Sequence, residues 1–240
     1  DRVNHFLFKD YERDGEYKEE FLEFYRKVDR YIGRIREMLP DDVTLMVASD
    51  HGFTSLDYEV HFNEWLEQNG WLSYEDDDHE ELGDIADDTK AYSLIPGRFY
   101  INLEGREPRG SVPEDEYEAV RDELKAELEA LEGPDGNKVA DRVVTHEDAF
   151  RGDHDDIAPD LVVIPNHGFD LKAGFKGGAD VFGVGPRNGM HSFDNASLFI
   201  DDADARIEDA DLFDIAPTML DLLEIDYDRT EFDGSSLLTS

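Results

Sequence analysis

The chain alternates amphipathic helical patterns with short apolar runs, and this alternation limits the folds open to it. From Glu16 to Leu39, apolar residues recur at spacings of three and four, which predicts an amphipathic helix. A nearly continuous apolar run follows at Val43–Ser49 and indicates a strand covered on both faces. Because strands and helices continue to alternate, we expect an α/β layered domain with a largely parallel sheet flanked by helices.

Two further helices and four further strands are predicted. One helix is expected to run from Pro113 to Leu131 and to end at Gly133-Pro134, and another to begin near Asp214, whose carboxylate can cap free N–H groups. The strands are expected at Phe99–Leu103, Arg142–Thr145, Leu161–Ile164 and Ser197–Ile200.

One acidic segment interrupts this order. The stretch Glu75–Asp88 is expected to be a surface insertion. We therefore predict a single α/β domain over residues 1–240, in which residues 75–132 form a cap or inserted subdomain.

The charge balance excludes several classes of protein. With 61 acidic and 23 basic residues, the formal net charge is −38, which excludes nucleic-acid binding through a general basic surface. The absence of cysteine excludes disulfides, thiolate zinc sites and a cysteine nucleophile. Aromatic residues make up 11% of the chain, so it can build a core. No apolar run approaches the ~20 residues of a membrane span. The charge predicts a high-salt cytoplasm, with an acidic mesophilic protein as the alternative.

Three short patterns combine carboxylates and imidazoles that could bind a metal ion. Asp1 and His5 are spaced i, i+4, which would place both side chains on one face of a helical turn. Asp50 and His51 follow the apolar run Val43–Ser49, where ligands gather in open α/β sheets. His191 follows a glycine-rich loop. A simple turn is the alternative interpretation of Asp50-His51-Gly52.

Taken together, these patterns resemble the alkaline phosphatase superfamily. The similarity is to its type I phosphodiesterase / nucleotide pyrophosphatase branch and to archaeal predicted phosphodiesterase or phosphomutase relatives, and the acidic composition points to a halophilic source. It rests on six segments in the family's order: DRVNHF at the start, SDHGF at 49–53, GRFYINLEGREPRG at 97–110, APDLVVIPN at 158–166, GMHSFDNASLFI at 189–200 and DIAPTMLDLLEI at 214–225.

The resemblance implies a site for two divalent metal ions, commonly zinc, with manganese as the alternative. Asp1, His5 and His191 match the ligands of one metal, and Asp50 and His51 match two ligands of the other. The family's remaining aspartate and its threonine or serine nucleophile precede the segment at which this chain begins. We therefore expect the C-terminal part of a larger enzyme, with its N-terminal part missing and no catalytic nucleophile in this chain.

The predicted function is metal-dependent hydrolysis of small phosphoesters by a phosphodiesterase or nucleotide pyrophosphatase. A phosphomutase similar to phosphoglycerate mutase and a non-catalytic metal-binding or interaction domain are the alternatives. Arg98, Arg106 and Arg109 stand out among few cations, and the first two are the candidates for substrate binding, as bidentate partners of a phosphate. The alternative is that they balance nearby carboxylates. The sequence leaves the oligomeric state open.

Other histidines receive lesser roles. His61 is predicted to be structural, and His79, in the acidic insertion, is predicted to be solvated. The acidic run 152–156, which contains His154, is a weaker candidate for cation binding.

Overall fold

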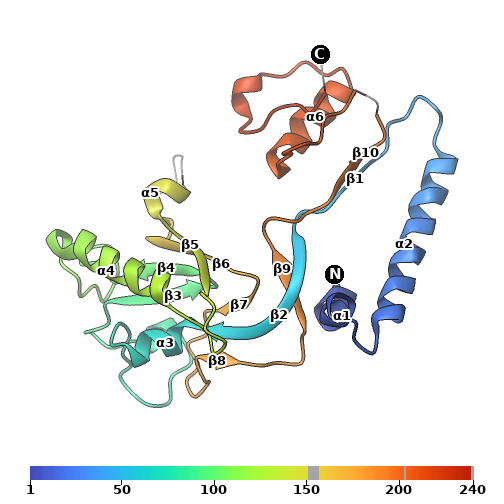
Figure 1. Ribbon diagram of the computed structural model, residues 1–240. Helices are drawn as coiled ribbons and strands as arrows, with labels where there is room; N and C mark the ends of the chain where they lie inside the picture. The colour runs from blue at the N-terminus through green and yellow to red at the C-terminus, as the bar shows by residue number, and fades with distance from the viewer. Residues whose placement is uncertain (151–156, 203, 239–240) are drawn as a thin grey trace. The chain divides into compact units, whose positions relative to one another are not determined.

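The computed structural model describes residues 1–150, 157–202 and 204–238 in two compact units (Figure 1). Unit 1 comprises Asp1–Thr54 and Gly189–Ser240, and unit 2 comprises Ser55–Asn188, inserted between the two parts of unit 1 in sequence. The predicted cap, residues 75–132, lies within unit 2 and stays a prediction, as does the single domain over 1–240. The acidic run 152–156 with His154 lies outside the described residues.

The described residues of unit 1 form three α-helices and three short strands, together with the start of a longer strand. Strand β2 (Gly52–His61) begins in this unit, continues into unit 2 and pairs with β9. The other elements are α1 (Arg2–Glu12), α2 (Lys18–Met38), α6 (Ile215–Leu222), β1 (Met46–Ala48), β9 (Gly189–Ser192) and β10 (Leu198–Ile200).

Aromatic rings join the first two helices of unit 1. Phe8 of α1 meets Phe21 of α2 edge to face at 5.9 Å between ring centroids, and Tyr11 stacks on the same Phe21 ring at 4.8 Å. Phe21 is buried, whereas Tyr31 and Ile35 further along α2 are half exposed. Helix α2 confirms the amphipathic helix predicted for Glu16–Leu39. The aromatic contacts pack the N-terminal half of α2 against α1.

Unit 2 is built on two groups of strands and contains a buried cluster of apolar side chains. One sheet has the order β3-β4-β6-β5, and β7 and β8 flank β2 in the other. The elements are α3 (Phe62–Gln68), α4 (Tyr117–Ala130), α5 (His146–Ala149), β3 (Ala91–Ile95), β4 (Arg98–Ile101), β5 (Ala140–Thr145), β6 (Leu161–Pro165), β7 (Gly168–Lys172) and β8 (Phe182–Gly183).

The core of unit 2 follows from the helical period of α4 and the alternation of the strands. Leu124 and Leu128 are spaced i, i+4 and fully buried, so they lie on one face of α4. Phe99 and Ile101 alternate along β4 and are equally buried, as expected of strand residues that point to one face. Short 3₁₀ turns at Leu82–Asp84, Glu114–Glu116, Leu212–Asp214 and Arg229–Glu231 complete the described elements.

The predicted elements are confirmed more fully than the predicted sheet. The helix expected at Pro113–Leu131 appears as a 3₁₀ turn followed by α4, and strands β4, β5, β6 and β10 lie where strands were expected. Among the strand pairs whose register is described, β2 with β7 is parallel. Pairs β1–β10, β2–β8, β3–β4, β4–β6 and β5–β6 are antiparallel. The largely parallel sheet is therefore not confirmed, because an apolar run reports burial but not the direction of its neighbour.

Two local expectations were wrong. Asp214 does precede α6, but its carboxylate accepts hydrogen bonds from the backbone N–H groups of Asp211 and Ser235, not from that helix. His79 is buried, not solvated: its ring stacks on Tyr74 at 3.4 Å between centroids, and its Nδ1 lies 2.5 Å from the carbonyl oxygen of Phe175. An acidic neighbourhood in sequence therefore did not keep this imidazole in water.

In the described part of the chain, no helix is both long and apolar enough to cross a membrane.

Candidate metal centre

Three of the predicted ligands converge within unit 1. Asp1 stands at the N-terminus of α1, His5 lies one turn further along the same helix, and His191 lies on β9. His191 Nε2 is 3.1 Å from Asp1 Oδ1, and His5 Nε2 is 3.7 Å from Asp1 Oδ2. One ligand atom from each residue lies within 4.8 Å of the other two, a spacing that a single cation between them could bridge.

A backbone contact fixes the orientation of His5. Its Nδ1 lies 2.9 Å from the carbonyl oxygen of Gly189, which accepts a hydrogen bond when this nitrogen carries the proton. The other ring nitrogen, Nε2, then faces Asp1 and His191. Helix α1 and strand β9 approach so closely here that a β-carbon at Gly189 would lie 2.3 Å from the carbonyl oxygen of Asn4. Glycine at this position therefore brings His5 and His191 together.

Asp50 and His51 lie beside these three residues. The His51 ring stacks on that of His191, with centroids 3.7 Å apart and an interplanar angle of 18°. His51 Nε2 lies 3.6 Å from Asp50 Oδ1, and His51 Nδ1 lies 3.0 Å from the carbonyl oxygen of Gly52. Strand β1 ends just before this pair, so the segment stands at a strand end as the sequence predicts.

A family model described as type I phosphodiesterase / nucleotide pyrophosphatase matches residues 1–194. The chain belongs to this family. No curated protein and no solved structure matches the chain. The matched residues include Asp1, His5, Asp50, His51 and His191. Proteins of this family are typically metal-dependent. Membership of the family indicates phosphoric ester hydrolysis as the class of reaction.

One side chain beside the candidate site, that of Asn195, was not singled out from the sequence. Asn195 accepts a hydrogen bond from the Phe53 N–H at 3.0 Å and donates one to the Phe53 carbonyl at 2.9 Å. A β-carbon at Gly52 would overlap the Asn195 side chain and approach the Ser192 hydroxyl. Asn195 thereby ties the segment after His51 to the segment after His191, and the quoted motif GMHSFDNASLFI was the signal that contained it.

An apolar ring supports the imidazoles of this site. Phe53 is buried and lies edge-on to His5 and His191, with centroid distances of 5.0 and 5.3 Å. An apolar surface beneath ligands restricts water on that side and limits the orientations of the rings.

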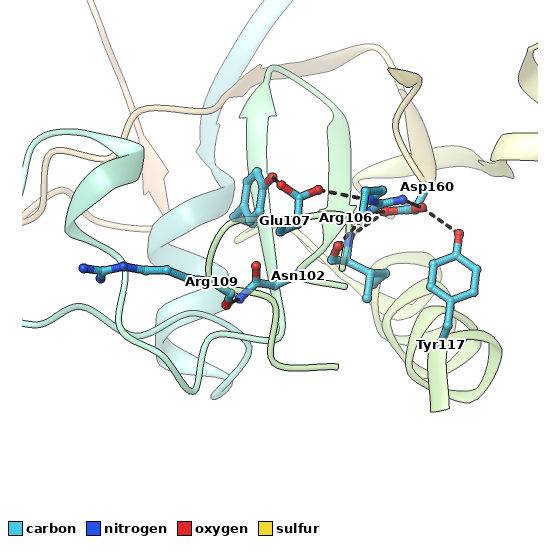
Figure 2. A network of polar contacts seen from close by, with 8 residues as sticks. Asn102, Arg106, Glu107, Arg109, Tyr117 and Asp160 are labelled. Atoms are coloured by element: carbon cyan, nitrogen blue, oxygen red, sulfur yellow. Dashed lines mark hydrogen bonds and ion pairs between the residues drawn. The ribbon is translucent and has the colours of Figure 1, made fainter. Parts of the chain in front are cut away.

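The candidate substrate-binding arginines belong to unit 2, where Arg106 is held by carboxylates (Figure 2). Its Nη1 and Nη2 donate to the two oxygens of Asp160 at 2.8 and 2.7 Å, and its Nε donates to Glu107 at 3.1 Å. Asp160 is fully buried and also accepts hydrogen bonds from the Tyr117 hydroxyl and the Ile101 N–H. These contacts match the charge-balancing alternative for Arg106.

Protonation in this network follows from the same contacts. Hydrogen bonds to Asp160 raise the pKa of Arg106 above its usual value, against the effect of burial. Burial, followed by the hydrogen bond to Asp160, raises the pKa of Tyr117 to about 12. Tyr117 thus remains a neutral donor and Arg106 a cation at ordinary pH.

The other two arginines make exposed or mixed contacts. Arg98 is exposed, with Nη1 3.3 Å from the carbonyl oxygen of Pro96, so its role in binding substrate stays a prediction. Arg109 pairs with Glu75 at 2.6 Å and donates to the Ile85 carbonyl.

Proposed function

We propose that this protein is a metal-dependent phosphodiesterase that hydrolyses small phosphodiesters. In this proposal, one divalent cation binds Asp1, His5 and His191, and a second binds Asp50 and His51 with further donors. The observation that supports it most directly is the convergence of the first three side chains within 4.8 Å, with the His51 ring stacked on His191.

The donor set suits zinc, with manganese as the alternative. Neutral imidazole and carboxylate are common zinc ligands, and a chain without cysteine offers no thiolate. The carbonyl oxygen of Gly189 lies within hydrogen-bonding distance of His5 Nδ1, and backbone carbonyls in this position commonly orient histidines that bind a metal through the other ring nitrogen. When bound, two such cations stabilise the attacking and leaving oxygens of a phosphoryl transfer.

The proposed reaction replaces one ester group of the phosphodiester with a hydroxyl group from water. In the net reaction a water oxygen replaces one ester oxygen on phosphorus: a bond from phosphorus to the water oxygen forms, and the bond from phosphorus to that ester oxygen breaks. The leaving ester oxygen takes a proton and departs as an alcohol or phenol, and a second proton passes to solvent at neutral pH. The products are a phosphate monoester and that alcohol.

The test is hydrolysis of bis(para-nitrophenyl) phosphate by the protein expressed from its complete reading frame, at high salt. After removal of metals with a chelator, we expect activity to be lost. We expect zinc or manganese to restore turnover at least about a hundredfold, a conservative share of what a metal pair supplies to such reactions. Absence of metal-dependent turnover would refute the proposal. Interconversion of phosphoglycerate isomers without net hydrolysis would instead favour the phosphomutase.

We further propose that the protein works in a high-salt cytoplasm. Its formal net charge is −38, so its acidic side chains repel one another strongly in dilute buffer, and salt weakens this repulsion. Raising KCl from about 0.1 M to about 1 M shortens the Debye length from about 10 Å to about 3 Å. We expect the melting temperature to rise by roughly 10 °C between dilute and multimolar KCl, corresponding to about 3 kcal/mol for a chain of this size. Chloride is chosen over sulfate, which stabilises most proteins by exclusion. A flat or falling melting temperature in a calorimetric scan would contradict this proposal.

A further inference from the structure

The side-chain amide of Asn195 pairs with the backbone of Phe53. Its Oδ1 accepts a hydrogen bond from the Phe53 N–H at 3.0 Å, and its Nδ2 donates one to the Phe53 carbonyl oxygen at 2.9 Å. Two residues on adjacent antiparallel strands that form a hydrogen-bonded pair exchange the same two bonds. A single side chain therefore holds the start of β2 in the way that a neighbouring strand would.

The surroundings of this amide leave little freedom in its position. The Ser192 hydroxyl donates a second hydrogen bond to Asn195 Oδ1, so both lone pairs of that oxygen are used. The amide also lies against Gly52: a β-carbon there would overlap Asn195 Oδ1 and lie 2.6 Å from the Ser192 hydroxyl oxygen. A side chain at position 52 would therefore displace the amide.

The contacts of Asn195 join the two segments that carry His51 and His191. Phe53 follows His51 by two residues, and Ser192 directly follows His191. The two imidazole rings stack with centroids 3.7 Å apart, so a shift of either segment would separate them. When each imidazole binds a cation, like charges lie close together across this stack and favour its opening. The hydrogen bonds of Asn195 oppose that separation.

We infer that Asn195 is a positioning residue for both proposed metal centres. In the proposed function, His191 binds the first cation and His51 binds the second. The amide of Asn195 is occupied by Phe53 and Ser192, so it acts on the ligands and not on the ions. It sets the spacing between the two imidazoles because it fixes the backbone beside each of them. The inference rests on the proposed function and adds a residue that its ligand set does not contain.

Zinc titration of the protein from the complete reading frame tests this role. A chromophoric chelator competes for the zinc, and we expect Asn195→Ala to weaken the binding of both ions by about tenfold, although the substitution removes no ligand. Tenfold equals about 1.4 kcal/mol, which is close to the net contribution of one or two hydrogen bonds. Loss of a ligand would instead weaken mainly the one ion that it binds.

A second variant, Gly52→Ala, displaces the same amide without changing residue 195. We expect it to lower both zinc affinities by a similar factor and, combined with Asn195→Ala, to add no more than about a twofold further loss. Either variant alone still tests the role if the other fails to fold. Losses that multiply to about a hundredfold in the double variant would show that the two residues act separately, and would overturn the inference.

Two controls separate positioning from general stability. Asn195 is exposed, and exposed hydrogen bonds contribute little to global stability, so the melting temperature of metal-free Asn195→Ala is expected to stay within about 4 °C of the unmodified protein. Asn166→Ala removes an amide of unit 2 that donates to the Lys138 carbonyl oxygen at 3.0 Å, and it is expected to leave zinc binding unchanged. A much larger fall in melting temperature, or an equal loss of zinc in the Asn166 variant, would contradict a positioning role.

The titration also distinguishes failure of this inference from failure of the proposed function. If the unmodified protein binds two zinc ions and Asn195→Ala binds both equally well, or weakens only one, the shared positioning role is refuted and the two-metal site stands. If the unmodified protein binds fewer than two zinc ions, the proposed two-metal function itself fails.

Discussion

Replacing His191 with alanine is expected to weaken zinc binding by about a hundredfold. Structural zinc sites with four ligands bind with about 10–16 kcal/mol, so one donor accounts for roughly 3 kcal/mol. At about 1.4 kcal/mol for each factor of ten, that loss equals about two orders of magnitude. The measurement is a competitive zinc titration with a chromophoric chelator, made on the protein expressed from its complete reading frame.

Two further variants make this result specific. His5→Ala is expected to cost as much as His191→Ala, because both imidazoles face Asp1. His167→Ala removes an exposed histidine of unit 2 and is expected to leave zinc affinity unchanged. If His167→Ala weakened binding as much as His191→Ala, zinc would be bound through scattered surface groups, and the assignment of this centre would fail.

Replacing Asp160 with asparagine is expected to destabilise the protein by about 3–5 kcal/mol, the usual cost of breaking a buried ion pair by removing one partner. Asp160 is 1% exposed and accepts two hydrogen bonds from Arg106, one from Tyr117 and one from the Ile101 N–H (Figure 2). An amide can neither neutralise Arg106 nor accept all four bonds. The measurement is urea unfolding at constant KCl.

The control for this variant is Asp141→Asn on β5. Asp141 pairs with Arg142 at 3.2 Å, but both side chains are more than half exposed, so a change within about 0.5 kcal/mol is expected. Equal effects of the two substitutions would contradict the structural role of the Arg106–Asp160 pair. If Asp160→Asn instead raised KM without lowering stability, Arg106 would be a substrate-binding residue, as one interpretation of the sequence had it.

The sequence predicted helices well where their apolar period was clear. Helix α2 lies within one or two residues of the predicted bounds, and α4 follows the predicted start after a 3₁₀ turn. Strand β2 was missed because Thr54, Ser55 and Asp57 interrupt its apolar residues. Thr54 and Ser55 are buried in the structure, but no alternation of apolar and polar residues in the sequence indicates their burial. Pairing direction was likewise hidden, since it depends on which distant strand lies alongside.

The candidate site was predicted from resemblance more than from spacing. The pair Asp1 and His5 follows from helical geometry, but His191 lies 190 residues from Asp1, and nothing local links it to them. The family motifs supplied that link. They could not supply the Gly189 carbonyl that orients His5 or the Asn195 contacts with Phe53, because backbone approach is set by tertiary packing.

The most direct test of the account is to locate the metals. Crystals grown or soaked with zinc would be measured at the zinc absorption edge, and the anomalous difference map would show each ion. We expect one ion at about 2.0–2.2 Å from Nε2 of His5, Nε2 of His191 and a carboxylate oxygen of Asp1, and a second ion beside Asp50 and His51. A map with no ion among Asp1, His5 and His191, or with zinc bound only to surface carboxylates elsewhere, would contradict the proposed metal centre.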